Sequence, residues 1–181
     1  MNLTSPEVIA NPGLERPAWH RHLQSSLGRF VTGAAVITAE GDQGPVGTLV
    51  GSFTSVSKEP PLVLVPVGKS TIVHDAMRGR PFVINVLGAE HRSLAAHFRG
   101  QCGSEPSWVA GEYAPRLRGM LAHFECTEWA DYDLGDRTLY VGRVEDFDYR
   151  QGDALGMEGD RFVSVPEWFL GRTEPGRVDL G

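Results

Sequence analysis

A chain of 181 residues can form one domain with its own hydrophobic core, and a composition that is 41% hydrophobic and 22% charged fits a globular protein. The net charge of −6 argues against nucleic acid or an anionic membrane as the main partner, and no apolar run approaches the length of a membrane span. The two cysteines, Cys102 and Cys126, fit no zinc spacing, and the N-terminus lacks the apolar segment of a secretory signal. We therefore expect two reduced thiols in a cytoplasmic protein.

The first predicted helix begins at Pro17, a residue suited to the first turn of a helix. Trp19, Leu23 and Leu27 recur at four-residue spacing and form one apolar stripe along it. A strand rich in Val, Ile and Thr follows at 34–39.

Hydroxyl side chains interrupt the next stretch, 46–65. A strand is predicted at 46–56, and a run of hydroxyls extends through its end: Ser52, Thr54, Ser55 and Ser57. Pro60-Pro61 then breaks the chain, and a continuous apolar run at 62–67 predicts a strand buried on both faces. A polar ligand at a sheet edge would give these hydroxyls partners. Alternatively, they bond to their own backbone, as Ser and Thr do in ordinary loops.

The rest of the chain predicts short elements. In chain order they are a helix at 70–78 capped by Ser70, a strand at 82–87, a helix at 90–99, a loop at 100–118, a strand at 120–129, a polar turn at 131–136, a strand at 137–149, and a Gly- and charge-rich tail with the cluster Trp168-Phe169. In the strand at 120–129, Ala122, Phe124 and Cys126 share one face and His123, Glu125 and Thr127 the other. Short strands without long alternating helices favour an antiparallel barrel.

Familiar catalytic and metal motifs are absent from the sequence. Gly68-Lys69-Ser70-Thr71 ends like a P-loop, but Val63 stands where that motif needs glycine. Lys69 beside two hydroxyls remains a plausible phosphate contact. The six histidines show no metal-ligand spacing, so we predict no metal site and interpret His123 as a surface or satisfied residue.

Four segments, in order, resemble the flavin reductase family with the FMN-binding split-barrel fold. They are 27–38, the stretch 46–65 with Ser52-Phe-Thr-Ser-Val-Ser57, 82–87, and Gly135-Asp136 followed by 140–144. The resemblance implies a mainly β, antiparallel Greek-key split barrel that forms a homodimer with flavin at the dimer edge. We expect a flexible arm at 1–16, one such domain at 17–170 and a tail at 171–181.

The resemblance also implies site residues. The flavin would be bound by Leu49, Val50, Gly51, Ser52, Ser55, Val56, Ser57, Lys69, Ser70, Thr71, Asn85 and Phe98, and the nicotinamide by Gly135, Asp136 and Arg137. The family often has Thr and Asn at the positions of Leu49 and Gly51, and His at that of Arg137. Three of these residues have structural alternatives: Asn85 as a polar residue at a strand bend, Phe98 as a core residue, and Arg137 as a solvated turn residue.

The implied activity is an NAD(P)H:flavin oxidoreductase that supplies reduced flavin to a partner monooxygenase, with FAD or FMN and NADH or NADPH as cofactors. Hydride passes directly between the two cofactors, so no catalytic acid–base residue is expected. Two alternatives are a split barrel that retains its flavin for its own substrate and a non-catalytic flavin- or haem-binding module.

Overall fold

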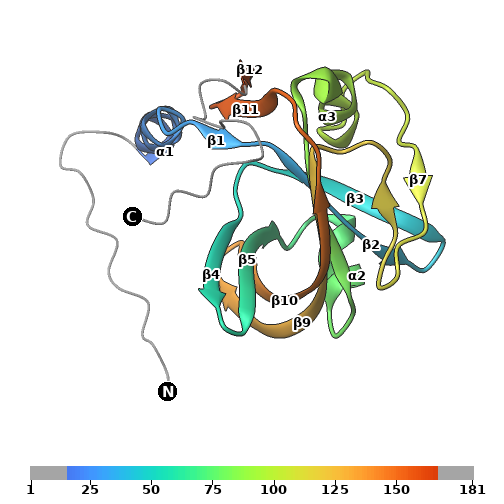
Figure 1. Cartoon of the computed structure of the whole chain (residues 1–181). Coiled ribbons are helices and arrows are strands. Elements are labelled where there is room, and N and C mark those ends of the chain that lie inside the picture. Colours follow the sequence, from blue (N-terminus) through green and yellow to red (C-terminus); the bar gives the residue numbers. More distant parts are fainter. Residues whose placement is uncertain (1–15, 167–181) are drawn as a thin grey trace, which may run out of the picture.

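The chain is organised around a seven-stranded antiparallel sheet with the strand order β3-β2-β6-β9-β10-β5-β4 (Figure 1). The computed structural model describes residues 16–166, so the tail at 171–181, the Trp168-Phe169 cluster and all of the predicted arm except Arg16 lie outside the described residues. The sheet strands are β2 (Ala35–Gly41), β3 (Gly44–Val50), β4 (Thr54–Lys58), β5 (Pro61–Gly68), β6 (Phe82–Val86), β9 (Ala122–Leu134) and β10 (Arg137–Tyr149). Every pair in this sheet is antiparallel, as the sequence predicted.

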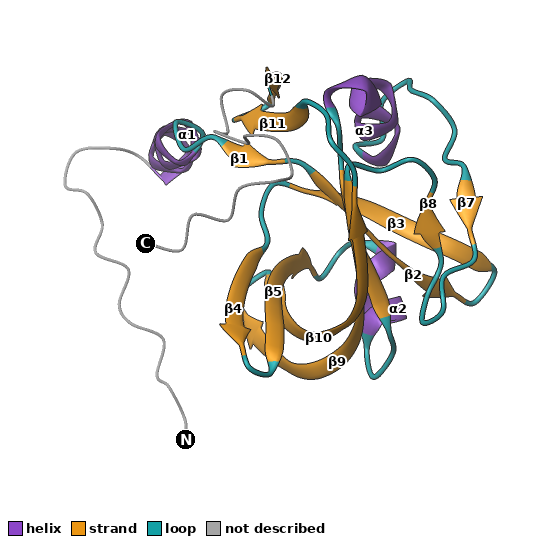
Figure 2. Ribbon diagram, in the orientation of Figure 1, coloured by secondary structure: helices purple, strands orange, loops and turns teal. Residues whose placement is uncertain are grey.

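The sheet is curled into a barrel because of where β3 and β4 lie. They occupy opposite edges of the sheet, yet only Gly51, Ser52 and Phe53 separate them in the chain. So short a connection can join the two edges only if the sheet bends round on itself, as Figure 2 shows. The prediction of one continuous strand at 46–56 was therefore wrong: the chain leaves one edge at Val50 and joins the other at Thr54.

The barrel core is filled from one face of each strand. Val63, Val65 and Val67 on β5 are buried together with Tyr140 on β10 and Phe82 on β6. The alternate residues of β5, among them Leu64 and Pro66, are only half-buried. Within one chain this strand is therefore buried on one face and only half-buried on the other, and not buried on both faces as predicted.

Two further groups of elements pack against the barrel. The helix α2 (Ile72–Met77) contributes Val73 and Met77 to the barrel core. A second core forms where α3 (Arg92–Phe98), preceded by the 3₁₀ turn η1 (Ala89–His91), meets the hairpin of β11 (Ala154–Glu158) and β12 (Arg161–Val165). The remaining elements are α1 (Arg16–Leu27), β1 (Thr32–Gly33), β7 (Trp108–Val109) and β8 (Arg116–Leu117), and α1 and β1 lie beside β11 in Figure 1.

Several predicted boundaries differ from the structure. Helix α2 begins at Ile72 with Thr71 at its N-cap, so Ser70 is not the capping residue. β9 continues to Leu134, because its cross-strand pairs with β10 extend the ribbon through the predicted polar turn. The hairpin of β11 and β12 lies within 152–181, the Gly- and charge-rich segment in which the sequence predicted no strand. None of the described helices is long and apolar enough to cross a membrane.

Candidate functional site

Three segments that are distant in the sequence line one cavity of about 360 Å³, which we call the Lys69 cavity. Its lining comes from the end of β3, the turn after β5, and the start of β10: Thr48, Leu49, Val50, Gly68, Lys69, Ser70, Thr71, Asp136 and Arg137. The structure thus brings together seven of the residues that the sequence assigned to flavin or nicotinamide binding. Thr48 and Gly68 are the lining residues that the sequence analysis missed.

Two turns shape this cavity and are bonded to each other. Thr71 closes the first turn, donating from both its backbone N–H and its hydroxyl to the carbonyl of Gly68. The second is the two-residue hairpin turn Gly135-Asp136 between β9 and β10, where Gly135 has a φ of +60° that suits glycine at the first position of such a turn. The N–H of Lys69 donates to the carbonyl of Asp136 at 3.0 Å, which fixes the two turns side by side.

Lys69 supplies the ammonium group of this cavity. Its Nζ lies 3.4 Å from Oδ1 of Asp133, and its side chain is 36% exposed. The hydrogen bond from Thr138 and then the contact with Lys69 hold the pKa of the Asp133 carboxyl below its usual range. The N–H of Lys69 and the N–H and hydroxyl of Thr71 are used within the two turns, so the donors that face a ligand are the Lys69 ammonium and the Ser70 hydroxyl, which suit a phosphate or the polyol chain attached to it.

A second cavity of about 430 Å³, the Ser52 cavity, adjoins the first. Arg137 lines both cavities, and Gly51 and Ser52 line this one with residues from α1, β1, β5 and the β11–β12 turn: Leu27, Gly28, Phe30, Thr32, Pro66, Met157 and Gly159. Gly51 lies close to its neighbours, since a Cβ added there would meet Thr32 Oγ1 at 3.3 Å. The sequence analysis did not connect these elements with the site, because their contacts depend on the fold.

Ser55, Val56 and Ser57 lie outside both cavities. They belong to β4, the edge strand of the sheet, where Ser55 pairs with Val63 and Ser57 with Leu62 across a register shift. Val56 is 54% exposed. Within one chain, the row of hydroxyls is therefore divided: Ser52 faces the Ser52 cavity and the others stand on the exposed edge.

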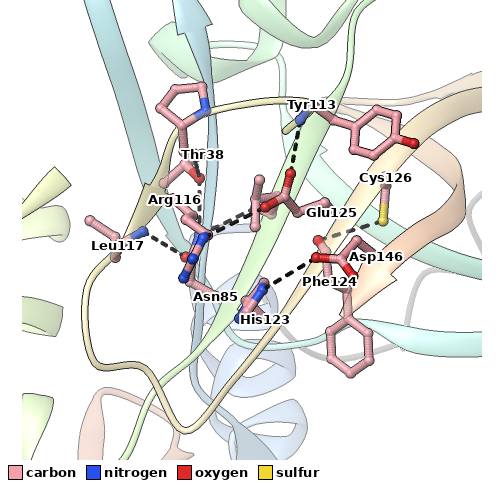
Figure 3. Close-up of polar contacts among 12 residues, drawn as sticks. Thr38, Asn85, Tyr113, Arg116, Leu117, His123, Phe124, Glu125, Cys126 and Asp146 are labelled. Carbon is pink, nitrogen blue, oxygen red and sulfur yellow. Dashed lines mark hydrogen bonds and ion pairs between the residues drawn. The ribbon is translucent and has the colours of Figure 1, made fainter. Parts of the chain in front are cut away.

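Asn85 is buried, and both ends of its side-chain amide make hydrogen bonds. Its Nδ2 donates to the carbonyl of Val36 and to the hydroxyl of Thr38, and its Oδ1 accepts from the N–H of Leu117 (Figure 3). It has no exposed surface and lines neither cavity. In this structure Asn85 joins β6 to β2 and β8, which favours its structural alternative over a contact with the flavin.

Phe98 is packed at a third site, on α3. It lines a separate cavity with Trp108 and Gly47, and its ring meets the Trp108 ring edge-on at 6.3 Å between centroids. A Cβ added at Gly47 would lie 2.7 Å from the Phe98 ring, so this glycine allows the ring to approach β3. Phe98 also packs against the second core, in keeping with its core alternative.

The fold also assembles a cluster that the sequence analysis did not predict. His123, Glu125 and Asp146 place potential metal-ligand atoms within 4.8 Å of one another (Figure 3). Glu125 is 2% exposed, accepts a hydrogen bond from the N–H of Tyr113, and lies 3.6 Å from Nε of Arg116. A guanidinium beside the central carboxylate opposes a second cation, so we interpret the cluster as an anchor for the loop before β8.

Comparisons with known proteins agree with this geometry. The family described as "Flavin reductase like domain" matches residues 27–166, and the chain belongs to this family. The FMN reductase (NADH) SmoA of Agrobacterium fabrum is 40% identical over 160 residues, covering 86% of this chain and 90% of that protein. The reductase subunit HsaB of a flavin-dependent monooxygenase from Rhodococcus jostii is 33% identical over 163 residues, covering 81% of this chain and 82% of that subunit.

Solved structures share the fold. The NADH:FAD oxidoreductase SgcE6 of Streptomyces globisporus superposes with a TM-score of 0.76 at 34% identity, over 94% of this chain and 99% of that one. The sequence-based prediction of family and of an antiparallel split barrel is confirmed.

Proposed function

We propose that the protein is an NADH-dependent flavin reductase that passes reduced flavin to a separate monooxygenase. The main support for this proposal is the Lys69 cavity, whose donors suit a phosphate. The Ser52 cavity lies next to it, and Arg137 lines both. The relatives are named as NADH-dependent reductases of FMN or FAD, and one is a monooxygenase subunit, which supports both the cofactors and the partner.

A bound flavin supplies the ring that accepts hydride from the nicotinamide, so the chain's part is binding and orientation. Lys69 and Ser70 bind the phosphate, Thr71 joins them when its hydroxyl turns from the carbonyl of Gly68, and the backbone from Leu49 to Ser52 binds the adjoining part of the flavin. Asp136 and Arg137 bind the incoming dinucleotide at the border of the two cavities. Leu49 and Gly51 serve through backbone N–H groups, which do not depend on the Thr and Asn that the family often has there.

A steady-state assay tests the proposal. Purified protein is mixed with NADH and either FMN or FAD, and the loss of NADH absorbance is followed, with NADPH as the parallel donor. Many turnovers with free flavin support a reductase. Stoichiometric, tightly bound flavin without turnover would contradict it and favour a protein that retains its flavin or only binds it.

The protein is also proposed to act as a homodimer. Two rows of apolar side chains run in register across the outer faces of three strands: Tyr132, Leu139 and Pro66, and Ala130, Val141 and Leu64. Tyr132 is 58% exposed, and Pro66 also lines the Ser52 cavity with Leu27 and Phe30, which links this face to α1. A face of this kind suits a second copy of the chain and lies at the edge of the proposed site. Both described cysteines are free thiols, which supports the predicted cytoplasmic location.

A further inference from the structure

A chain of polar groups leads from the interior of the barrel to the Lys69 cavity. His74 on α2 is only 4% exposed, and its Nε2 lies 2.9 Å from Oγ1 of Thr138 on β10, which is fully buried. The Thr138 hydroxyl donates to Oδ1 of Asp133 at 2.6 Å. The same oxygen lies 3.4 Å from Nζ of Lys69, where the chain ends.

The chemistry of the groups fixes the direction of these hydrogen bonds. An ionised carboxylate only accepts, and the Thr138 bond, together with Lys69, holds the pKa of the Asp133 carboxyl below its usual range. The single hydroxyl hydrogen of Thr138 is therefore used on Asp133. The Thr138 oxygen must then accept, and Nε2–H of His74 is the donor within reach.

His74 contacts Tyr140 through its backbone carbonyl and its ring, and it contacts Asp75 through Nδ1. The hydroxyl of the buried Tyr140 donates to the His74 carbonyl at 2.8 Å, and the two rings meet edge-on. Nδ1 lies 2.9 Å from Oδ1 of Asp75, whose side chain is 89% exposed; this contact is a hydrogen bond only when Nδ1 carries a hydrogen as well as Nε2. The imidazole is buried, and its Nε2 faces Thr138.

The two ends of the chain differ in mobility. His74 and Thr138 are buried, whereas the side chains of Asp133 and Lys69 are 56% and 36% exposed. Without a fixed partner, both exposed side chains would sample many rotamers, and binding a ligand through Lys69 would carry the entropy cost of ordering it. The Thr138 bond holds Asp133, and Asp133 then takes one of the three N–H groups of Lys69 and leaves the others for a ligand.

We propose that His74 and Thr138 are positioning residues, which act through Asp133 to orient Lys69 toward the phosphate of the bound flavin. This inference rests on the proposed function, because the phosphate belongs to the flavin of that proposal. Neither His74 nor Thr138 lines the cavity, so their effect is transmitted only through Asp133 and Lys69. The carboxylate of Asp133 opposes the charge of the phosphate, so the gain comes from orientation and not from added charge.

Flavins with and without a phosphate separate this role from a general loss of structure. Dissociation constants for FMN and riboflavin are measured from the quenching of flavin fluorescence. Thr138→Val, which removes the hydroxyl and keeps the shape, should weaken FMN about three- to tenfold and leave riboflavin unchanged. Thr138→Ser, which keeps the hydroxyl, should retain the wild-type preference for FMN.

Lys69→Ala supplies the second arm of the experiment. It should remove most of the preference for FMN over riboflavin, and adding Thr138→Val to it should change nothing further, because both substitutions act through one group. His74→Leu should match Thr138→Val, and His74→Gln, whose amide can still donate to Thr138, should be milder.

The possible failures are distinguishable. FAD is measured alongside; if wild-type protein binds none of FMN, riboflavin and FAD, the proposed function fails and this inference with it. If flavin binds and Lys69→Ala keeps the preference for FMN, the function stands and the positioning role is overturned. It is also overturned if Thr138→Val weakens both flavins equally, tightens FMN binding, or adds its full effect to that of Lys69→Ala.

Discussion

Arg137 stands at the first position of β10 and lines both the Lys69 cavity and the Ser52 cavity. Its guanidinium can bind a phosphate through two parallel hydrogen bonds but cannot relay a proton at neutral pH. We predict that Arg137→Ala raises KM for NADH about tenfold and leaves kcat nearly unchanged, as expected when an interaction common to ground and transition states is lost. Steady-state kinetics at saturating flavin measure both constants.

The same strand offers a matched control for Arg137. Arg143 lines neither cavity and pairs with Glu145 through Nη2 at 2.6 Å, so Arg143→Ala should leave KM for NADH unchanged. A fall in kcat at constant KM for Arg137→Ala would assign the residue to the chemical step. No change in either constant would leave it as a solvated turn residue.

The two thiols differ in environment. Burial, followed by the carboxylates of Glu145 and Glu125, raises the pKa of the Cys126 thiol to about 12, whereas Cys102 is exposed. The native state therefore disfavours the Cys126 thiolate. Its contribution to stability is complete below the unfolded pKa of about 8.5 and is lost as the pH rises from there toward 12, by about 1.4 kcal/mol per pH unit.

Urea unfolding at about pH 8 and pH 10 tests this prediction. The free energy of unfolding should fall by about 2 kcal/mol more in the wild type than in Cys126→Ala, which has no thiol to ionise at that site. The slope compared is the change in the free energy of unfolding with pH. Taking the difference between the two proteins removes the contribution of other groups, such as Tyr140, because burial raises its pKa in both proteins alike. Equal slopes in the two proteins would show that Cys126 ionises as freely in the native state as in the unfolded one.

At the scale of elements, β10 fits closely against β6 at Gly142. This glycine lies next to a register shift in the pairing of β10 with β9. A Cβ added there would lie 2.5 Å from Cζ of Phe82 and 2.9 Å from Cβ of Cys126, both fully buried. We predict that Gly142→Ala destabilises the protein by about 1–3 kcal/mol, the usual range for overpacking a core.

Gly33→Ala is the matched control, because a Cβ added to this strand residue of β1 meets no atom within 4 Å. Its free energy of unfolding should stay within about 0.5 kcal/mol of the wild type. Both values are read from urea unfolding at neutral pH. Equal stability of the two variants would mean that β10 shifts to accommodate the added methyl group.

Sequence patterns predicted elements where local signals were strong. The strand at 137–149 was predicted with the bounds that β10 has, because a polar turn precedes it and aliphatic and aromatic residues recur along it. The hairpin of β11 and β12 was missed, because its glycines and charges look like loop sequence and its strands are stabilised by contacts with β1 and α3. The break at Gly51–Phe53 was missed because apolar and hydroxyl residues continue through it, and only the closure of the barrel divides it.

The site was predictable only in part for a related reason. Resemblance identified Lys69 and Arg137, which short motifs mark, and the fold brings them to one cavity. The links from His74 and Thr138 to Asp133 join three elements, and no spacing in the sequence indicates them. Asn85, which the resemblance assigned to the flavin, lines neither cavity and bonds to β2 and to Leu117 of β8, contacts that no sequence spacing indicates.

At the scale of the whole molecule, one chain leaves the outer face of β5, β9 and β10 partly exposed, since Val141 is 7% exposed but Tyr132 is 58% exposed. Leu139 lies at the centre of its row, paired with Tyr132 on one side and Pro66 on the other. Phe30, which lines the Ser52 cavity with Pro66, is 75% exposed. Exposed apolar surface that is continuous over several elements marks an interface, and a twofold dimer is the commonest way to cover it.

We therefore predict that the protein is a dimer at micromolar concentration and that Leu139→Arg converts it to a monomer, because an unpaired guanidinium would be buried at the centre of the interface. Light scattering should give twice 19.8 kDa for the wild type and 19.8 kDa for the variant. Tyr149→Arg is the control, since Tyr149 is 70% exposed on the same strand but lies beyond this face, and it should remain dimeric. A wild-type particle of 19.8 kDa, or a Leu139→Arg variant that remains dimeric, would contradict this interface; in the second case the partner must cover a different face of the barrel.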